Sequence, residues 1–318
     1  MTDSSNTLAF LFPGQGSQAV GMGKDLAEKY PVARHTFEEA DEVLGYKLSQ
    51  LCFEGPEDQL RLTEVTQPAI LTVSVAVLRV LETRIPKPRY VAGHSLGEYS
   101  AHVASGTISF ADAVRTVRNR GQYMQEAVPV GVGTMAAILG MELAKVIAVC
   151  QEAAQGEVCE PANINSPEQI VISGNTAAVE RATKLAAEHG AKKAKLLPVS
   201  APFHCSLMKP AQDRLEADLN ALKMMKPVYP VACNVEAELV TDALRARDTL
   251  VRQVTGAVKW EQCVRLLMAH GVDTFIEVGP GKVLWGVMRQ IDRSKTSLNV
   301  SDHTTLAKTL ESLAKATV

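Results

Sequence analysis

The sequence predicts an α/β protein built on a central parallel sheet, and three observations support that prediction. Short apolar runs that fit buried strands alternate with amphipathic stretches that fit helices, an order typical of parallel sheets. Two of the runs end in glycine-containing turns, at residues 13–18 and 93–97. Between residues 129 and 202 the order changes to strand, helix, strand, strand, helix, strand, which predicts a small inserted domain.

The composition excludes several classes of protein. Of the 318 residues, 46% are hydrophobic and 21% are charged, as in ordinary globular proteins. The formal net charge of -2 provides no basic field, so we expect no nucleic-acid partner. The six cysteines have neither C-x-x-C nor metal-finger spacing, which predicts reduced thiols and no metal site.

The sequence further predicts a cytoplasmic protein without a membrane partner. No basic segment followed by a long apolar stretch occurs at the N-terminus, so we expect no signal peptide. The longest apolar stretch, residues 69–81, is interrupted by Thr72, Ser74 and Arg79 and is too short to span a bilayer. It predicts a buried helix, with Thr66 as its N-cap and its end near residue 84.

The first predicted strand, residues 8–12, leads into the glycine-rich turn. Gly14, Gly16 and Ala19 match the dinucleotide-binding pattern G-x-G-x-x-G/A. We reject that interpretation because the pattern also requires a second strand that ends in an acidic residue, whereas residues 31–44 predict a helix. The turn is instead expected to direct main-chain amides into a site.

The sequence Gly93-His94-Ser95-Leu96-Gly97 lies between an apolar run, residues 90–92, and a helix-compatible run, residues 98–104. Strand, sharp turn and helix are the setting in which G-x-S-x-G forms a nucleophile elbow. Such a turn raises the serine hydroxyl above the sheet and places the next amide at a helix N-terminus. The pattern predicts a nucleophilic serine.

The remaining elements complete the two predicted domains. A helix over residues 110–127 precedes the insertion, and the insertion itself has the order of the ferredoxin-like unit. Its expected elements are strands at 134–140, 158–164, 169–174 and 192–199 and helices at 142–154 and 176–190. The C-terminal part is expected to contain helices at 206–222, 248–254 and 260–270, an extended segment at 227–235, and strands at 274–278 and 297–301.

Several motifs occur in order along the chain. They are Gly14-Gln15-Gly16-Ser17-Gln18, Gly93-His94-Ser95-Leu96-Gly97-Glu98, Arg120-Gly121-x-x-Met124, Ala201-Pro202-Phe203-His204 and Glu277-Val278-Gly279-Pro280-Gly281. Together they resemble the signatures of the malonyl-CoA:acyl carrier protein transacylases of bacterial fatty-acid synthesis. The resemblance implies an α/β-hydrolase-like catalytic domain (1–128 and 203–318) and a ferredoxin-like small domain (129–202). It also implies malonyl transfer from malonyl-CoA to an acidic acyl carrier protein, with no cofactor.

The resemblance implies a role for each motif residue. Ser95 would be the nucleophile and His204 its base, with His94 a less suitable alternative base. The main-chain N–H groups of Gln15 and Leu96 would form the oxyanion hole. Arg120 would bind the malonyl carboxylate, because a planar guanidinium matches a carboxylate.

Other residues are expected around this site. A main-chain carbonyl near Gln253 would orient His204, so we expect a dyad without a third acidic residue. The resemblance places further residues in the pocket: Phe203, Asn163, Ser200, Met124 and His94. Carrier docking is expected near Lys192, Lys193, Lys195, Lys209 and Lys282.

Three alternatives remain open from the sequence. The same serine and histidine would serve a thioesterase or another serine hydrolase. An acyltransferase of polyketide type, with a different acyl preference, would share the fold. A module that only docks carrier proteins is the third, although the presence of Ser95, His204 and Arg120 argues against it.

Overall fold

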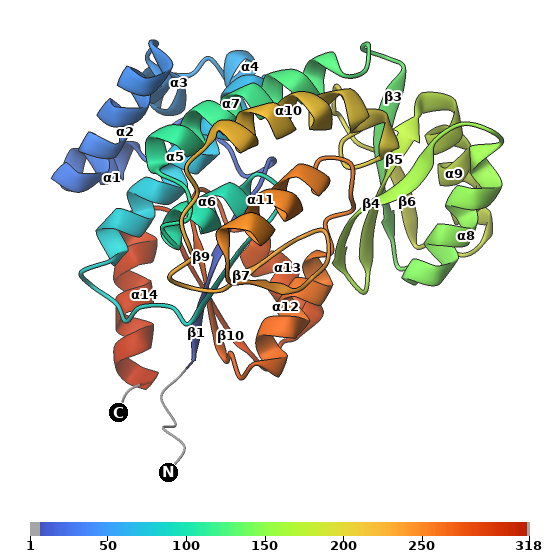
Figure 1. Cartoon of the computed structure of the whole chain (residues 1–318). Coiled ribbons are helices and arrows are strands. Elements are labelled where there is room, and N and C mark those ends of the chain that lie inside the picture. Colours follow the sequence, from blue (N-terminus) through green and yellow to red (C-terminus); the bar gives the residue numbers. More distant parts are fainter. Residues whose placement is uncertain (1–6, 317–318) are drawn as a thin grey trace.

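The computed structural model describes residues 7–316 and contains two sheets, each with its own helices (Figure 1). The larger sheet has the strand order β10-β9-β1-β2-β7-β8. All neighbours in it are parallel except β7 and β8, so the predicted central parallel sheet is confirmed. The bounds are β1 Leu8–Phe12, β2 Tyr90–Gly93, β7 Val231–Ala232, β8 Leu239–Val240, β9 Thr274–Val278 and β10 Thr296–Val300.

The apolar run of β1 is buried on both faces, because helices cover both sides of the sheet. Phe10 and Phe12 belong to one core cluster, whereas Ala9 and Leu11 belong to another. This alternation follows from the two-residue period of a strand and explains why the run is apolar without interruption. The first cluster includes residues of α2 (Pro31–Leu44), α6 (Gly97–Ala104), α7 (Phe110–Glu126) and α10 (Lys209–Ala221), and the second includes residues of α12 (Trp260–Ala269) and α13 (Val283–Ile291).

The apolar helix α5 begins earlier than the sequence predicts. It spans Thr63–Leu81 with Leu62 at the N-cap position, so the expected N-cap role of Thr66 is wrong. The Thr66 hydroxyl lies inside the helix and donates to the main-chain oxygen of Leu60 at 2.6 Å, which removes it from capping. By length and composition α5 is apolar enough to cross a membrane, but it is buried inside the fold and is a core helix.

Several other boundaries differ from the prediction. Three short helices, α1 (Lys24–Lys29), α3 (Leu48–Glu54) and α4 (Glu57–Leu60), were not expected, because such lengths carry little periodic signal. Helix α11 (Ala243–Arg252) begins before the predicted residue 248, because the Asp242 side chain caps it by accepting from Arg245 N at 2.8 Å. The C-terminal helix is α14 (His303–Ala316).

The second sheet is antiparallel, with the order β4-β5-β3-β6. Its elements follow the predicted order: β3 Gly133–Leu139, α8 Leu143–Ala154, β4 Cys159–Ser166, β5 Gln169–Asn175, α9 Thr176–Glu188 and β6 Lys193–Leu196. Strand β6 is shorter than the predicted 192–199. Figure 1 shows α8 and α9 on the outer side of this sheet, away from the parallel sheet.

Strand β4 joins the two parts of the molecule. The amide of Ile164 donates to Val258 O at 2.9 Å, and the amide of Val258 donates to Ala162 O at 2.8 Å. The segment that carries Val258 runs from the end of α11 to α12 in the larger part. The small sheet is therefore fixed beside the carboxyl ends of the parallel strands.

Candidate active site

The site lies where the central strands end. Gln15 follows β1 and Ser95 follows β2, which are neighbouring parallel strands. His204 comes from the chain that returns from the small sheet, just before a short 3-10 turn (Ser206–Met208) and α10. Sites beyond the carboxyl ends of parallel strands are typical of such sheets.

The glycines of the elbow are required by close backbone approach. A Cβ atom on Gly93 would lie 1.9 Å from the main-chain oxygen of Gly97, and one on Gly97 would lie 2.2 Å from that of Phe12. Between them Ser95 has a φ of 53°, in the left-handed region that few side chains tolerate. The strand, turn and helix predicted around Ser95 are confirmed.

Ser95 and His204 are paired. Ser95 Oγ lies 2.7 Å from His204 Nε2, and His204 Nδ1 lies 2.9 Å from the main-chain oxygen of Gln253. A carbonyl oxygen can only accept, so Nδ1 carries the hydrogen and Nε2 is free to accept the serine proton. The structure thus brings Ser95, His204 and the Gln253 carbonyl together, and among the described residues no carboxylate forms a hydrogen bond with this imidazole.

The His204 imidazole is held in its neutral form. It is 3% exposed, and burial together with the nearby Arg120 charge lowers its pKa to about 3. A neutral imidazole whose Nε2 faces a hydroxyl can accept a proton from it. The pair can therefore generate a nucleophilic serine.

Arg120 lies at the same point and is 1% exposed. Its Nη2 donates to Ser95 Oγ at 3.1 Å and to Gln253 Oε1 at 3.0 Å, while Nη1 donates to Gln67 Oε1 at 2.7 Å. Burial lowers its pKa from the ordinary value. No carboxylate among residues 7–316 forms an ion pair with this guanidinium, which is unusual for a buried charge.

The two amides expected to form an oxyanion hole are free of protein acceptors. Within the described part of the chain, neither the N–H of Gln15 nor that of Leu96 donates a hydrogen bond to the protein. The N–H of Ser95 itself is occupied, because it donates to Asn234 Oδ1 at 2.8 Å. The Gln15 side chain is exposed, so its amide is the part of the residue available to a site.

His94 is turned away from the serine. Its Nε2 lies 2.8 Å from Asn165 Oδ1 of β4, and its ring packs 5.6 Å from the Trp260 ring. Burial lowers its pKa as well. These contacts link the elbow to the small sheet, and the alternative in which His94 is the base receives no geometric support.

The other predicted pocket residues differ in position. Met124 is buried, and its Sδ accepts at 3.9 Å from Nε2 of Gln67, the residue that also bonds to Arg120. Phe203 is 8% exposed and belongs to the core cluster that contains Phe10 and Phe12. Among the described residues, neither Ser200 nor Asn163 forms a hydrogen bond with Ser95 Oγ or the His204 ring. Ser200 Oγ donates to Gln125 Oε1 at 2.5 Å near the surface, and Asn163 is buried in β4.

The sequence did not indicate three polar residues of this region: Gln67, which bonds to Arg120; Asn165, which bonds to His94; and Asn234, which bonds to the elbow. Glu98 belongs to the elbow motif but was given no role, and it accepts from Asn234 N and Gln253 Nε2. Asn234 follows β7, the neighbour of β2, and its place after a strand is the signal that could have identified it. Gln67 carried no such signal, because it lies inside an apolar helix.

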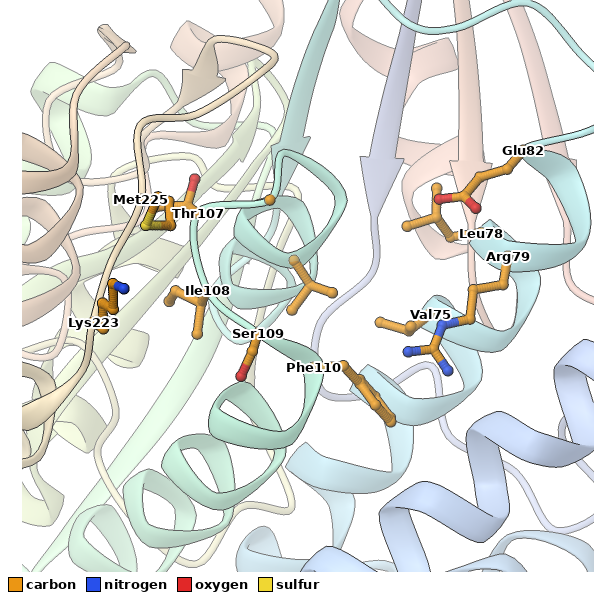
Figure 2. A pocket seen from close by; sticks show the side chains of 12 residues that line it. Val75, Leu78, Arg79, Glu82, Thr107, Ile108, Ser109, Phe110, Lys223 and Met225 are labelled. Atoms are coloured by element: carbon orange, nitrogen blue, oxygen red, sulfur yellow. The ribbon is translucent and has the colours of Figure 1, made fainter.

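A separate cavity lies outside this site. No group of His, Cys, Asp and Glu side chains within residues 7–316 is arranged to hold a metal ion. A cavity of about 380 Å³ lies between the end of α5, the start of α7 and the loop that carries Lys223, as Figure 2 shows. None of its lining residues is a predicted site residue.

An α/β fold whose elbow serine is paired with a buried histidine defines a serine enzyme of acyl-transfer chemistry. The chain belongs to the family whose model is described as the acyl transferase domain, which matches residues 9–312. It is 49% identical over 304 residues to a malonyl CoA-acyl carrier protein transacylase of Escherichia coli, covering 95% of this chain and 98% of that protein.

Solved structures agree with this assignment. The malonyl CoA-acyl carrier protein transacylase of Coxiella burnetii superposes with a TM-score of 0.95 at 43% identity, covering 97% of this chain and 98% of that one. A malonyl-transacylase solved in complex with a type II PKS acyl-carrier protein has a TM-score of 0.94 at 45% identity, covering 96% and 99%.

Proposed function

We propose that this chain transfers a malonyl group from malonyl-CoA to the phosphopantetheine thiol of acyl carrier protein in fatty-acid synthesis. The observation that carries the proposal is the 2.7 Å pair of Ser95 and His204 beside Arg120, a buried guanidinium that donates to the same serine. The names of the relatives supply the acyl group and the carrier.

In the proposed first half-reaction Ser95 Oγ attacks the thioester carbonyl while His204 Nε2 accepts its proton. The carbonyl oxygen becomes an oxyanion, which the N–H groups of Gln15 and Leu96 would stabilise by about 3–4 kcal/mol each. The intermediate then collapses, the C–S bond breaks, and His204 returns the proton to the coenzyme A sulfur. The carrier thiol attacks malonyl-Ser95 in the same way and regenerates the free hydroxyl.

Arg120 would bind the malonyl carboxylate. A buried guanidinium without a carboxylate partner among the described residues offers a charge that a substrate carboxylate would neutralise. Acetyl-CoA has no such group and would leave the guanidinium unpaired. This penalty would disfavour acetyl-CoA relative to malonyl-CoA. Met124 and Phe203 would form apolar walls, and the Gln253 carbonyl would hold His204.

Several further assignments belong to the same proposal. The topologies support an α/β-hydrolase-like large domain over 1–128 and 203–318 and a ferredoxin-like domain over 129–202, since the small sheet has the order β4-β5-β3-β6 with both helices on one side.

Dyad chemistry requires no cofactor, coenzyme A being part of the substrate. We assign the protein to the cytoplasm. Its exposed lysines at 192, 193, 195 and 282 would face an acidic carrier.

Intact-mass measurement tests the proposal. Malonyl-CoA alone should add one malonyl group, located on Ser95 by peptide mapping, and the Ser95→Ala variant should remain unmodified. Addition of carrier protein with its phosphopantetheine arm should then remove the adduct and yield malonyl-carrier. Release of free malonate in place of malonyl-carrier would show a hydrolase instead.

A second acceptor is tested in the same assay. One relative was solved with a type II polyketide carrier, so a polyketide carrier is the alternative acceptor. The two carriers should be compared at equal concentration. Faster transfer to the polyketide carrier would assign the chain to that chemistry, while leaving the malonyl-serine step unchanged.

A further inference from the structure

Asn234 bridges the two peptide groups on either side of His94, inside the elbow. Its Oδ1 accepts from the N–H of Ser95 at 2.8 Å, and its Nδ2 donates to the main-chain oxygen of Gly93 at 2.8 Å. A carboxamide offers a donor and an acceptor side by side, as these two bonds require. Asn234 is 0% exposed, so water does not compete for these bonds.

The asparagine is itself held in place. Its main-chain N–H donates to Glu98 Oε2 at 3.0 Å, and Gln253 Nε2 donates to the same oxygen at 2.7 Å. The Gln253 amide also donates to the main-chain oxygen of Ser95 at 2.9 Å. Both sides of the Ser95 residue, its N–H and its C=O, are therefore fixed by buried side chains from distant segments.

The elbow requires such support. Ser95 has a φ of 53°, a conformation that a non-glycine residue keeps only when its surroundings fix it. A peptide that turned by a few tens of degrees would move the hydroxyl away from His204 Nε2. Asn234 Oδ1 accepts the hydrogen bond of the Ser95 N–H, so Asn234 supplies the constraint on that side.

We propose that Asn234 is a positioning residue for the nucleophile, whose carboxamide fixes the Ser95 peptide and thereby aligns Ser95 Oγ with His204 and the Leu96 N–H with the developing oxyanion. The inference rests on the proposed role of Ser95 as nucleophile. It also explains why the Ser95 N–H takes no part in the oxyanion hole: Asn234 already accepts its hydrogen bond.

Asn234→Ala and Asn234→Asp test the proposal. The aspartate keeps the size of the side chain but presents an oxygen to the Gly93 carbonyl, whereas the alanine also removes volume. Comparison of the two variants therefore separates lost hydrogen bonding from lost volume. The first-order rate of Ser95 acylation at saturating malonyl-CoA, followed by rapid quench and intact mass, should fall by about tenfold to 100-fold in both variants. KM for malonyl-CoA should stay within about twofold, because Asn234 does not bond to Arg120 directly and the Gln253 amide between them, 3.3 Å from Asn234 Oδ1, is also held by the Ser95 carbonyl and Glu98.

Asn175→Ala is the matched control. Its Oδ1 also accepts a main-chain N–H at 2.8 Å, from Val158, but in the small sheet. This variant should lose stability and keep the acylation rate per folded molecule, with the folded fraction read from tryptophan fluorescence, to which both Trp260 and Trp285 contribute. Acylation at the wild-type rate in either Asn234 variant, or an equal loss in Asn175→Ala, would overturn the proposal.

A fluorophosphonate probe separates this inference from the proposed function. Such a probe phosphonylates an activated serine without requiring a malonyl group, and fluoride leaves. Wild-type protein labelled at Ser95 but not malonylated would refute the proposed substrate, and the Asn234 variants would still be expected to label about tenfold more slowly. Labelling of the Asn234 variants at the wild-type rate would refute the positioning role alone.

Discussion

The His204 imidazole donates through Nδ1 to the main-chain oxygen of Gln253 at 2.9 Å, and this contact fixes which nitrogen faces Ser95. A carboxylate in that position would stabilise the imidazolium more strongly than a neutral carbonyl does. Thioesters are activated acyl donors, so the weaker base is sufficient for the proposed reaction.

The acylation rate should depend little on pH in the range where an ordinary histidine titrates. Burial lowers the His204 pKa to about 3, so the imidazole stays neutral and basic at every pH above that value. Single-turnover acylation should therefore show no loss due to His204 between about pH 8 and pH 5. Burial raises the Glu98 pKa to about 7, so the profile is best measured in Glu98→Gln as well. An inflection near pH 6.5 that persists in that variant would contradict the assignment.

Arg120→Ala should change acyl preference. The substitution removes the guanidinium that would bind the malonyl carboxylate. Malonyl acylation should therefore fall by about 100-fold, and acetyl transfer should rise relative to malonyl transfer. The ratio of kcat/KM for malonyl-CoA and acetyl-CoA measures this. Arg115→Ala is the control on the same helix, because Arg115 is exposed and pairs with Asp112 at 3.2 Å. An unchanged ratio in Arg120→Ala would remove the carboxylate clamp from the mechanism.

Phe203→Ser should widen acyl choice. The side chain precedes His204 and is buried, so its removal should make room for a branched α-carbon. The methylmalonyl-to-malonyl ratio of kcat/KM should rise by about tenfold. A ratio is insensitive to partial unfolding, which matters because truncation of a buried aromatic costs about 3–5 kcal/mol. Phe53→Ser, in the edge contact of α3 with Phe37, should leave the ratio unchanged.

Gly121→Ala should destabilise the fold, because α5 and α7 approach closely at this point. A Cβ atom on Gly121 would lie 2.6 Å from the Thr63 main-chain oxygen. We expect a loss of about 1–3 kcal/mol in the free energy of unfolding, measured with urea. Gly286→Ala in α13 is the counterpart. Apart from its chain neighbours and the backbone of its own helix, no heavy atom lies within 4 Å of a Cβ placed there. The free energy of unfolding should therefore rise by about 0.4–1 kcal/mol. Equal effects of the two substitutions would disprove the close approach.

His102→Leu should make the protein less sensitive to acid. His102 is fully buried in α6, neither ring nitrogen has a partner among the described residues, and burial lowers its pKa from 6.5 to about 3. At pH 5 the unfolded chain binds a proton there and the folded chain does not, so acidification favours unfolding. Between pH 7 and pH 5 the variant should gain about 2 kcal/mol relative to wild type. Parallel loss of stability in both proteins would show that His102 does not titrate in this way.

Much of the fold and part of the site followed from local patterns. The buried runs that became β1 and β9, the elbow around Ser95 and the order of the small sheet depend on neighbours within a few residues, where periodicity and turn chemistry apply. The predicted start of α5 was wrong because Thr66 is a residue type that often caps helices. Only the structure shows that its hydroxyl donates to the main-chain oxygen of Leu60 instead. Short helices such as α4 were missed because four residues show no period.

The sequence by itself determined the α/β plan with a central parallel sheet and indicated Ser95 as the candidate nucleophile, while the family resemblance indicated His204, Arg120 and the carbonyl near Gln253 as its proposed partners. The tertiary structure alone decided that Asn234 and Gln67 belong to the same centre and that Glu98, which the elbow motif includes, contacts Asn234 and Gln253 there. Ser95 and Asn234 are separated by 139 positions, and Gln67 and Arg120 by 53. No local pattern encodes such a contact, because it exists only once parallel strands bring their carboxyl ends together and burial leaves each polar group dependent on a specific partner.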